Sequence, residues 1–227
     1  MNQDEQIITA PARIRGTIAV PGDKSISHRS LMFGSLAVGT SRITGILESD
    51  DISSTIYCLK LLGADIRMDG EDVLVTGKGF GGIAEPSFPL DCGNSGTTAR
   101  LLAGIISGLP FSSILTGDES LRSRPMARII DPLTRLGASI KSDSSDNLLP
   151  LRISPTSDIQ DNLFIETGVA SAQVKSAILL CALSAGVSVT IKEPLPSRDH
   201  TCLLYPSYAS DDAYRCSLVW PRSIKKK

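Results

Sequence analysis

The chain has 227 residues, a formal net charge of −1 at pH 7, 41% hydrophobic residues and only 4% aromatic residues. The hydrophobic content is sufficient for a folded core, whereas the near-neutral charge and scarce aromatic side chains argue against a nucleic-acid partner. The chain starts with acidic and polar residues and has no long apolar run, which predicts a cytoplasmic protein without a membrane partner. It has two histidines and five cysteines without metal-binding spacing, which predicts a reducing compartment and no metal.

The first predicted unit covers about residues 21–85. It is predicted to hold a helix over residues 25–39, a strand over 41–46, an amphipathic helix over 50–62, and a hairpin that joins 64–67 with 73–75. The amphipathic helix carries its apolar residues on one stripe, begins at two aspartates and ends at Gly63. We expect the first helix, which is apolar nearly all round, to be buried.

The same order of elements recurs in a second unit, about residues 86–155. There the elements are predicted over residues 94–108, 112–116, 125–137, and 138–141 with 149–153. A third unit starts with a helix over residues 171–186 and a strand over 187–191. Since a strand enters each unit, the sequence predicts an α/β fold built from repeated βαβαββ units, each too long for a solenoid repeat.

The third unit stops early. Residues 197–201 are typical of a second helix start. The amphipathic stripe of the earlier units does not follow, and neither does the Leu-Gly-Ala phrase that ends it at residues 62–64 and 136–138. The segment 202–227 instead holds three of the four tyrosines, the only tryptophan and a final run of three lysines. We therefore predict a truncated third unit, residues 156–201, and an aberrant, disordered tail after it, with a frameshift, a splice or a divergent natural end as its possible origins.

Three polar loops lead directly into the three apolar helices, at residues 21–29, 91–98 and 168–176. A loop-to-helix junction offers free backbone N–H groups and the positive end of the helix dipole, which together attract phosphate and carboxylate. Basic side chains at Lys24, Arg29 and Lys175 accompany these junctions. The sequence thus predicts a small substrate that carries more than one anionic group.

Five motifs carry a resemblance to a known family: residues 21–29, 94–97, 115–118 with 124–126, 171–176 and 197–201. In order and spacing they resemble the 5-enolpyruvylshikimate-3-phosphate synthase family, over about residues 14–201. The resemblance implies an enolpyruvyl transferase-like lobe, an inside-out α/β barrel of βαβαββ units that corresponds to about half of a family chain. Residues 1–20 would then supply a strand that in the family belongs to the other lobe.

The resemblance also implies an activity. The family moves the carboxyvinyl group of phosphoenolpyruvate to the 5-hydroxyl of shikimate 3-phosphate and releases phosphate, without a cofactor, as a monomeric enzyme of chorismate and aromatic amino acid biosynthesis. Its general acid–base residues lie mainly in the other lobe, so we expect this chain to be inactive alone. The alternatives are a non-catalytic remnant that binds shikimate 3-phosphate, and a UDP-N-acetylglucosamine enolpyruvyl transferase, which the absence of cysteine from residues 116–124 disfavours.

Residue by residue, the resemblance places Lys24 against both substrates, as the one catalytic residue expected in this half. Ser25 and Arg29 would hold shikimate 3-phosphate, although Ser25 also suits a helix N-cap. Gly96 would lie beside phosphoenolpyruvate, where any side chain would crowd the ligand. Asn94, in the same loop, could donate a hydrogen bond.

Arg124 would clamp phosphoenolpyruvate, for which a guanidinium fork is suited. Ser171, Ala172 and Gln173 would form the shikimate-phosphate loop, with Gln173 also near phosphoenolpyruvate. Because some relatives carry serine at the position of Ala172, only its backbone N–H can be expected to contribute. Arg198 would contact the sugar ring or the phosphate, as in a subset of the family.

Three further residues are predicted to have supporting roles. His28 lies inside the first motif and is expected to be structural. Lys175 is expected to strengthen the anion-attracting field without touching the substrate. Cys92 precedes the second loop. We do not expect it to act as a nucleophile, because no base lies at a matching spacing.

Overall fold

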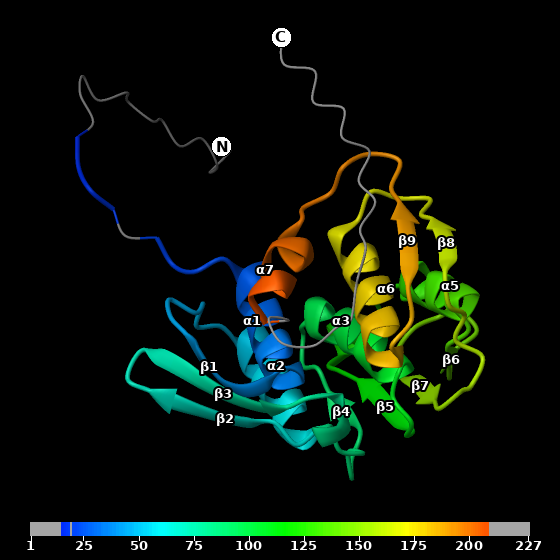
Figure 1. Ribbon diagram of the computed structural model, residues 1–227, viewed down its shortest axis with the longest axis horizontal. Helices are drawn as coiled ribbons and strands as arrows, with labels where there is room; N and C mark the ends of the chain where they lie inside the picture. The colour runs from blue at the N-terminus through cyan, green and yellow to red at the C-terminus, as the bar shows by residue number, and fades with distance from the viewer. Residues whose placement is uncertain (1–14, 19, 209–227) are drawn as a thin grey trace, which may run out of the picture.

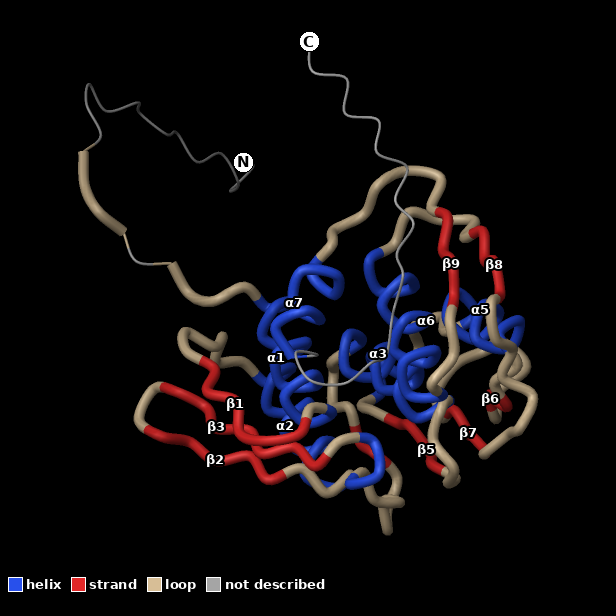
Figure 2. The backbone as a smooth tube through the Cα atoms, in the orientation of Figure 1, coloured by secondary structure: helices blue, strands red, loops and turns tan. Residues whose placement is uncertain are grey.

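The computed structural model describes residues 15–18 and 20–208. Figures 1 and 2 show α-helices gathered in the interior and small β-sheets around them. The helices are α1 (Lys24–Leu36), α2 (Asp50–Leu61), α3 (Gly96–Ser107), α4 (Glu119–Arg122), α5 (Ala127–Leu136), α6 (Ala172–Ala185) and α7 (His200–Tyr208), with a 3₁₀ helix at Phe80–Gly82. The strands are β1 (Val38–Ile43), β2 (Asp65–Asp69), β3 (Asp72–Lys78), β4 (Leu90–Asp91), β5 (Ser113–Thr116), β6 (Ser139–Ser142), β7 (Leu151–Ser154), β8 (Leu163–Glu166) and β9 (Val189–Lys192).

The sheets show the repeat that the sequence predicted. The first has the order β1-β3-β2, the second β4-β5-β7-β6 and the third β8-β9. In the first two, the strand after the long helix pairs antiparallel with the second strand of a hairpin, β1 with β3 and β5 with β7. In the second and third sheets, the strand that enters the unit runs parallel to the strand after the long helix, β4 to β5 and β8 to β9. The predicted α/β fold is confirmed.

One strand lies earlier than predicted. The sequence placed it at residues 41–46, whereas β1 begins at Val38, because its pairing with β3 already starts at Val38 opposite Lys78. The chain then turns away at Gly45, whose φ of 63° is a backbone conformation that glycine adopts without strain.

Of the two expectations about the ends of the chain, one stays a prediction and one needs correction. The strand predicted for residues 1–20 would pair in the other half of the family fold; the described residues 15–18 and 20 lie in no sheet here. The remaining residues of that segment lie outside the described ones. Disorder was predicted from residue 202, but α7 continues to Tyr208, because Cys202, Leu204 and Tyr205 pack against the core. Residues 209–227 lie outside the described part.

Helices α3 and α6 form the centre of the core. All but one of the α3 residues are buried, as are the nine consecutive α6 residues from Val174 to Ala182, which confirms the predicted burial of apolar helices. Their close approach depends on Gly104, where an added Cβ would lie 2.3 Å from the backbone oxygen of Ala177. The missing side chain therefore sets the distance between the two helices.

Substitution Gly104→Ala should destabilise the fold by about 1–3 kcal/mol, because the new methyl group would overlap with backbone that cannot rotate away. Urea unfolding measures the effect. Gly81→Ala is the matched control, since a Cβ there meets nothing within 4 Å. Equal stability of the two variants would contradict the close α3–α6 contact.

A buried chain of polar side chains ties α1, α2 and α3 together. His28 Nδ1 lies 2.6 Å from Thr55 Oγ1, and Thr55 Oγ1 lies 2.6 Å from Thr98 Oγ1. Thr98 Oγ1 in turn lies 2.7 Å from Ser95 Oγ. All four residues are fully buried, so the hydrogen bonds replace those that water would make. Burial chiefly lowers the pKa of His28 from 6.5 to about 4; Lys24 and Arg29 also lower it, while Asp51 opposes the shift.

Acid should therefore unfold the chain partly through His28. Between pH 6.5 and 4 the unfolded chain binds a proton on this imidazole that the folded chain does not, so stability falls as the pH drops through this window. We expect His28→Asn to remove about 2 kcal/mol of the stability loss between pH 7 and pH 5. Urea unfolding of both proteins at the two pH values measures it, and identical pH dependence would refute a buried neutral imidazole.

Candidate functional site

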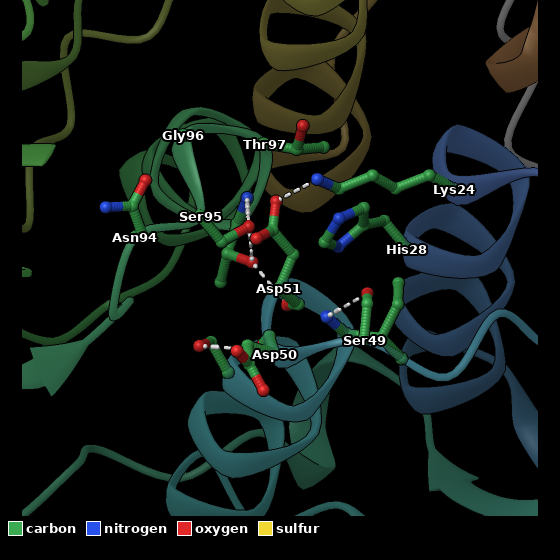
Figure 3. Close-up of polar contacts among 12 residues, drawn as sticks. Lys24, His28, Ser49, Asp50, Asp51, Asn94, Ser95, Gly96 and Thr97 are labelled. Atoms are coloured by element: carbon green, nitrogen blue, oxygen red, sulfur yellow. Dashed lines mark hydrogen bonds and ion pairs between the residues drawn. The ribbon is translucent and has the colours of Figure 1, made fainter.

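The N-terminal ends of four helices meet at one place. Gln173 in the first turn of α6 donates from Nε2 to Thr97 Oγ1 in the first turn of α3, at 3.0 Å. Thr98 Oγ1 of α3 lies 3.4 Å from the backbone oxygen of Asp51 in the first turn of α2. Lys24, the first residue of α1, forms an ion pair with the side chain of Asp51 (Figure 3). The three polar loops that the sequence singled out thus converge, and the start of α2 joins them.

Each of these helices has one side-chain cap. The capping residues are Asp23, Ser49, Ser95 and Ser171, whose side chains accept from the N–H groups of Ile26, Ile52, Thr98 and Val174. The possible N-cap role of Ser25 is therefore wrong, since Asp23 has the required position and Ser25 lies inside α1. That hydrogen bond from the Ile26 amide is the main reason why the pKa of Asp23 is lowered. A helix leaves four N–H groups unpaired, so one cap per helix leaves others for a ligand.

Lys24 is an accessible cation at the joined helix starts. Its side chain is 48% exposed and pairs with Asp51, which is 22% exposed. Figure 3 shows Lys24 and Asp51 facing each other across the gap between α1 and α2, beside Ser95, Gly96 and Thr97 of α3. The sequence analysis used Asp51 only as a helix start and missed its contact with Lys24. No local signal could have shown it, because the pairing joins residues of two different helices.

The second loop is covered by two arginines. Arg124 donates from Nη1 to the backbone oxygen of Asn94 at 3.3 Å and from Nη2 to its Oδ1. A Cβ added at Gly96 would lie 2.5 Å from Arg100 Nη1 and 3.5 Å from Arg124 Nη1. Only glycine therefore allows the Arg100 guanidinium group to lie so close to the start of α3, whereas Arg124 would be at an ordinary contact distance.

Asn94 is already engaged on both sides. Besides accepting from Arg124, it donates from Nδ2 to Asp118 Oδ2 at 2.7 Å. The pKa of Asp118 is lowered first by the backbone N–H of Leu121, which it caps, and then by Asn94. Asn94 thus orients Arg124 in this structure.

The third loop contacts both of the others. Gln173 Oε1 accepts from Arg100 Nη1 at 3.3 Å, while the backbone oxygen of Ala172 accepts from Arg29 Nη2 at 3.5 Å. Ser171 caps α6 through Val174, as noted above. Ser171, Ala172 and Gln173 are all partly exposed or exposed, so this loop can reach a ligand.

Arg29 lies deeper than the sequence suggested. It is only 2% exposed and donates to Thr201 Oγ1 at 2.8 Å, to the backbone oxygen of Ser25 at 2.9 Å and to Ser176 Oγ at 2.7 Å. Burial lowers its pKa to about 10, so it keeps its charge at neutral pH. In this structure Arg29 links α1, α6 and α7 from behind the helix starts.

Lys175 is likewise buried and paired. Its Nζ lies 2.8 Å from Glu193 Oε2 and 2.8 Å from Asp199 Oδ1. Although burial opposes it, the hydrogen bonds to the two carboxylates raise the pKa of Lys175. The pair fixes the segment that carries Arg198, which is exposed. The expectation that Lys175 acts without direct substrate contact stays a prediction, which the burial of its side chain supports.

Arg100 is the main residue that the sequence analysis missed. It is 8% exposed, within an otherwise apolar and hydroxyl-bearing stretch of α3, and its Nε has no hydrogen-bond partner among the described residues. Burial lowers its pKa, and the like charges of Arg128 and Arg124 add to this. A charged residue inside a helix predicted to be buried was the available signal, because such residues are rare without a partner.

The described cysteines are free thiols, and three of the four are buried. Cys92 is buried beside Cys58; their hydrogen bond, then burial, raise the pKa of Cys92, which leaves it unreactive. Within residues 15–18 and 20–208 no three His, Cys, Asp or Glu side chains cluster as a metal site. None of the described helices is long and apolar enough to cross a membrane.

Taken together, the site can bind anions. It combines helix N-termini, the exposed Lys24, and the guanidinium groups of Arg100 and Arg124, with Asp51 and Asp118 as the neighbouring carboxylates. Charge-assisted hydrogen bonds to phosphate or carboxylate are the interactions that such donors favour. The several separate donors suit a ligand, or a pair of ligands, with more than one anionic group.

Comparison with known proteins gives the family. The family model of EPSP synthase (3-phosphoshikimate 1-carboxyvinyltransferase) matches residues 8–206, slightly more than the predicted 14–201. A curated 3-phosphoshikimate 1-carboxyvinyltransferase of Herpetosiphon aurantiacus is 49% identical over 197 residues, which cover 87% of this chain and 45% of that protein. One of Geobacillus thermodenitrificans is 47% identical over 223 residues, which cover 97% of this chain and 51% of that protein.

A solved structure agrees. The EPSP synthase of Acinetobacter baumannii superposes with a TM-score of 0.76 at 43% identity, over 82% of this chain and 42% of that one. The chain thus spans about half the length of the relatives that it matches. It belongs to the EPSP synthase family.

Proposed function

We propose that the chain binds shikimate 3-phosphate and phosphoenolpyruvate at the joined helix starts and takes part in transfer of the carboxyvinyl group from the second to the first. The observation that carries the proposal is the meeting of the N-termini of α1, α3 and α6 beside Lys24, Arg100 and Arg124. Both substrates carry a phosphate and a carboxylate, which matches the several anion donors. The names of the relatives support this choice of substrates.

We propose that different hydrogen-bond donors of the site bind the two substrates. Lys24 stands between the starts of α1, α2 and α3, where one compact charge can serve two anions at once. We propose that the Ser171–Gln173 loop and Ser25 hold shikimate 3-phosphate, with Arg198 at its rim. Gly96 and Arg124 would hold phosphoenolpyruvate, and Arg29 would act indirectly, by fixing α1 against α6.

Positioning is the contribution that these residues can make. Binding both reactants in contact removes the entropy of bringing them together, and fixed cations stabilise the phosphate that leaves. We propose that protons are moved by groups in the part of the family fold that this chain does not cover, so that turnover needs that part as well. The chain as given would then bind the substrates but turn them over poorly.

Calorimetry with shikimate 3-phosphate tests the proposal, and Lys24→Met is the informative variant. Losing one charge-assisted hydrogen bond should weaken binding roughly 10- to 100-fold. Lys60→Met is the matched control, because Lys60 is an exposed lysine in the last turn of α2, at the opposite end of that helix. If the wild-type chain gave no heat at millimolar ligand, the proposed function would be wrong.

Gly96→Ala separates the two substrates. The added methyl group meets only the flexible ends of Arg100 and Arg124, so the fold should tolerate it. We expect binding of phosphoenolpyruvate to chain saturated with shikimate 3-phosphate to weaken roughly tenfold or more, since the methyl group displaces the Arg100 guanidinium group and occupies space beside the loop. Titration of shikimate 3-phosphate alone serves as the internal control and should change little. A uniform loss for both ligands would contradict the assignment of Gly96.

A further inference from the structure

The surroundings of His28 fix where the proton of its neutral imidazole lies, at one end of the buried polar chain from α1 to α3. His28 Nε2 is buried and makes no hydrogen bond among the described residues, whereas Nδ1 lies 2.6 Å from Thr55 Oγ1. A proton on Nε2 would be a buried N–H donor without an acceptor, which is rarer in proteins than a buried acceptor without a donor. The proton of the neutral ring therefore belongs on Nδ1, and His28 donates to Thr55.

The next links follow from the same count. Because Thr55 Oγ1 accepts from His28, its single hydroxyl proton points onward, either to Thr98 Oγ1 at 2.6 Å or to the backbone oxygen of Asp51 at 3.2 Å. Thr98 Oγ1 also reaches that oxygen, at 3.4 Å, and the cap residue Ser95 at 2.7 Å. The hydroxyl groups of both Thr55 and Thr98 thus lie within hydrogen-bond distance of the Asp51 backbone oxygen, while the side chain of Asp51 forms the ion pair with Lys24.

We propose that His28 is a positioning residue, which as the Nδ1-protonated neutral imidazole anchors Thr55, Asp51 and Thr98 and so holds Lys24 at a fixed place relative to the Gly96 loop. This inference rests on the proposed function, because it concerns the same anion site. Figure 3 shows His28 next to Lys24 and pointing toward Asp51, which is where such a support is needed. His28 itself is fully buried, so a ligand at the helix starts would not reach its side chain.

The first test needs no ligand. Long-range ¹H–¹⁵N spectra of the whole chain at pH 7 report the tautomer of each histidine, and His28→Asn identifies the His28 signals. A neutral Nδ1-protonated ring supports the proposal, whereas an Nε2-protonated or charged ring overturns it. The ¹³Cγ shift of Asp51 should move in Thr55→Val, an isosteric change that removes only the central hydroxyl, and an unmoved shift also counts against the proposal.

The second test measures affinity for shikimate 3-phosphate by calorimetry at a temperature where every variant is folded. Thr55→Val and His28→Leu should bind at least fivefold more weakly. His28→Asn should stay within about twofold of wild type, because its amide N–H can take the place of Nδ1–H. Ser107→Ala, which removes a buried hydroxyl at the far end of α3, is the matched control and should change nothing.

The outcomes separate the two proposals. Unchanged affinity in Thr55→Val would refute the positioning role while leaving the anion site intact. Equal losses in His28→Asn and His28→Leu would also refute it, since bulk rather than the hydrogen bond would then matter. If the wild-type chain did not bind the ligand at all, the proposed function would fail, and the spectra of the first test would still decide whether His28 anchors Asp51.

Discussion

The structure depends on one constraint, which is that buried helices must satisfy their N-terminal backbone groups. Helices α3 and α6 are apolar nearly all round and pack in the centre, so water cannot reach their flanks. Their unpaired N–H groups can be served only at the ends. Because each end has a single side-chain cap, placing these ends together creates a concentrated positive pole. The anion site thus follows from the way in which the core is packed.

The same place collects cations that the fold alone does not require. Arg100 is buried, and its Nε has no hydrogen-bond partner among the described residues. Burial and the like charges of Arg128 and Arg124 lower its pKa. An arrangement of this kind lowers stability in the absence of an anion, so it is expected at a functional site rather than in a structural core. Lys24, by contrast, is held by Asp51, a partner that an incoming phosphate can replace without leaving the lysine unpaired.

Much of the fold could be predicted because its signals are local. The apolar helices, their glycine ends and the hairpins depend on spacing along the chain, and the structure has them within a few residues of the predicted positions. The site was less predictable, because the contacts of Asp51 and Arg100 join separate helices and leave no periodic pattern. The N-cap of α1 could have been found, since Asp23 has the required spacing to Ile26. The start of α7 was indicated by residues 197–201, but its continuation to Tyr208 could not be predicted, because it depends on packing against α1, including the Phe33–Tyr205 contact at 6.1 Å between ring centroids.

Arg29 illustrates how a motif residue can serve a site without touching its ligand. The hydrogen bonds that it donates go to hydroxyl and carbonyl oxygens of α1, α6 and α7, so its positive charge is not cancelled by an ion pair in these bonds. Charges inside a protein are screened less than charges in water, so this one adds to the potential at the helix starts. A lysine could supply the charge but not the planar set of donors that joins three helices. The requirement for arginine at this position therefore follows from geometry as much as from charge.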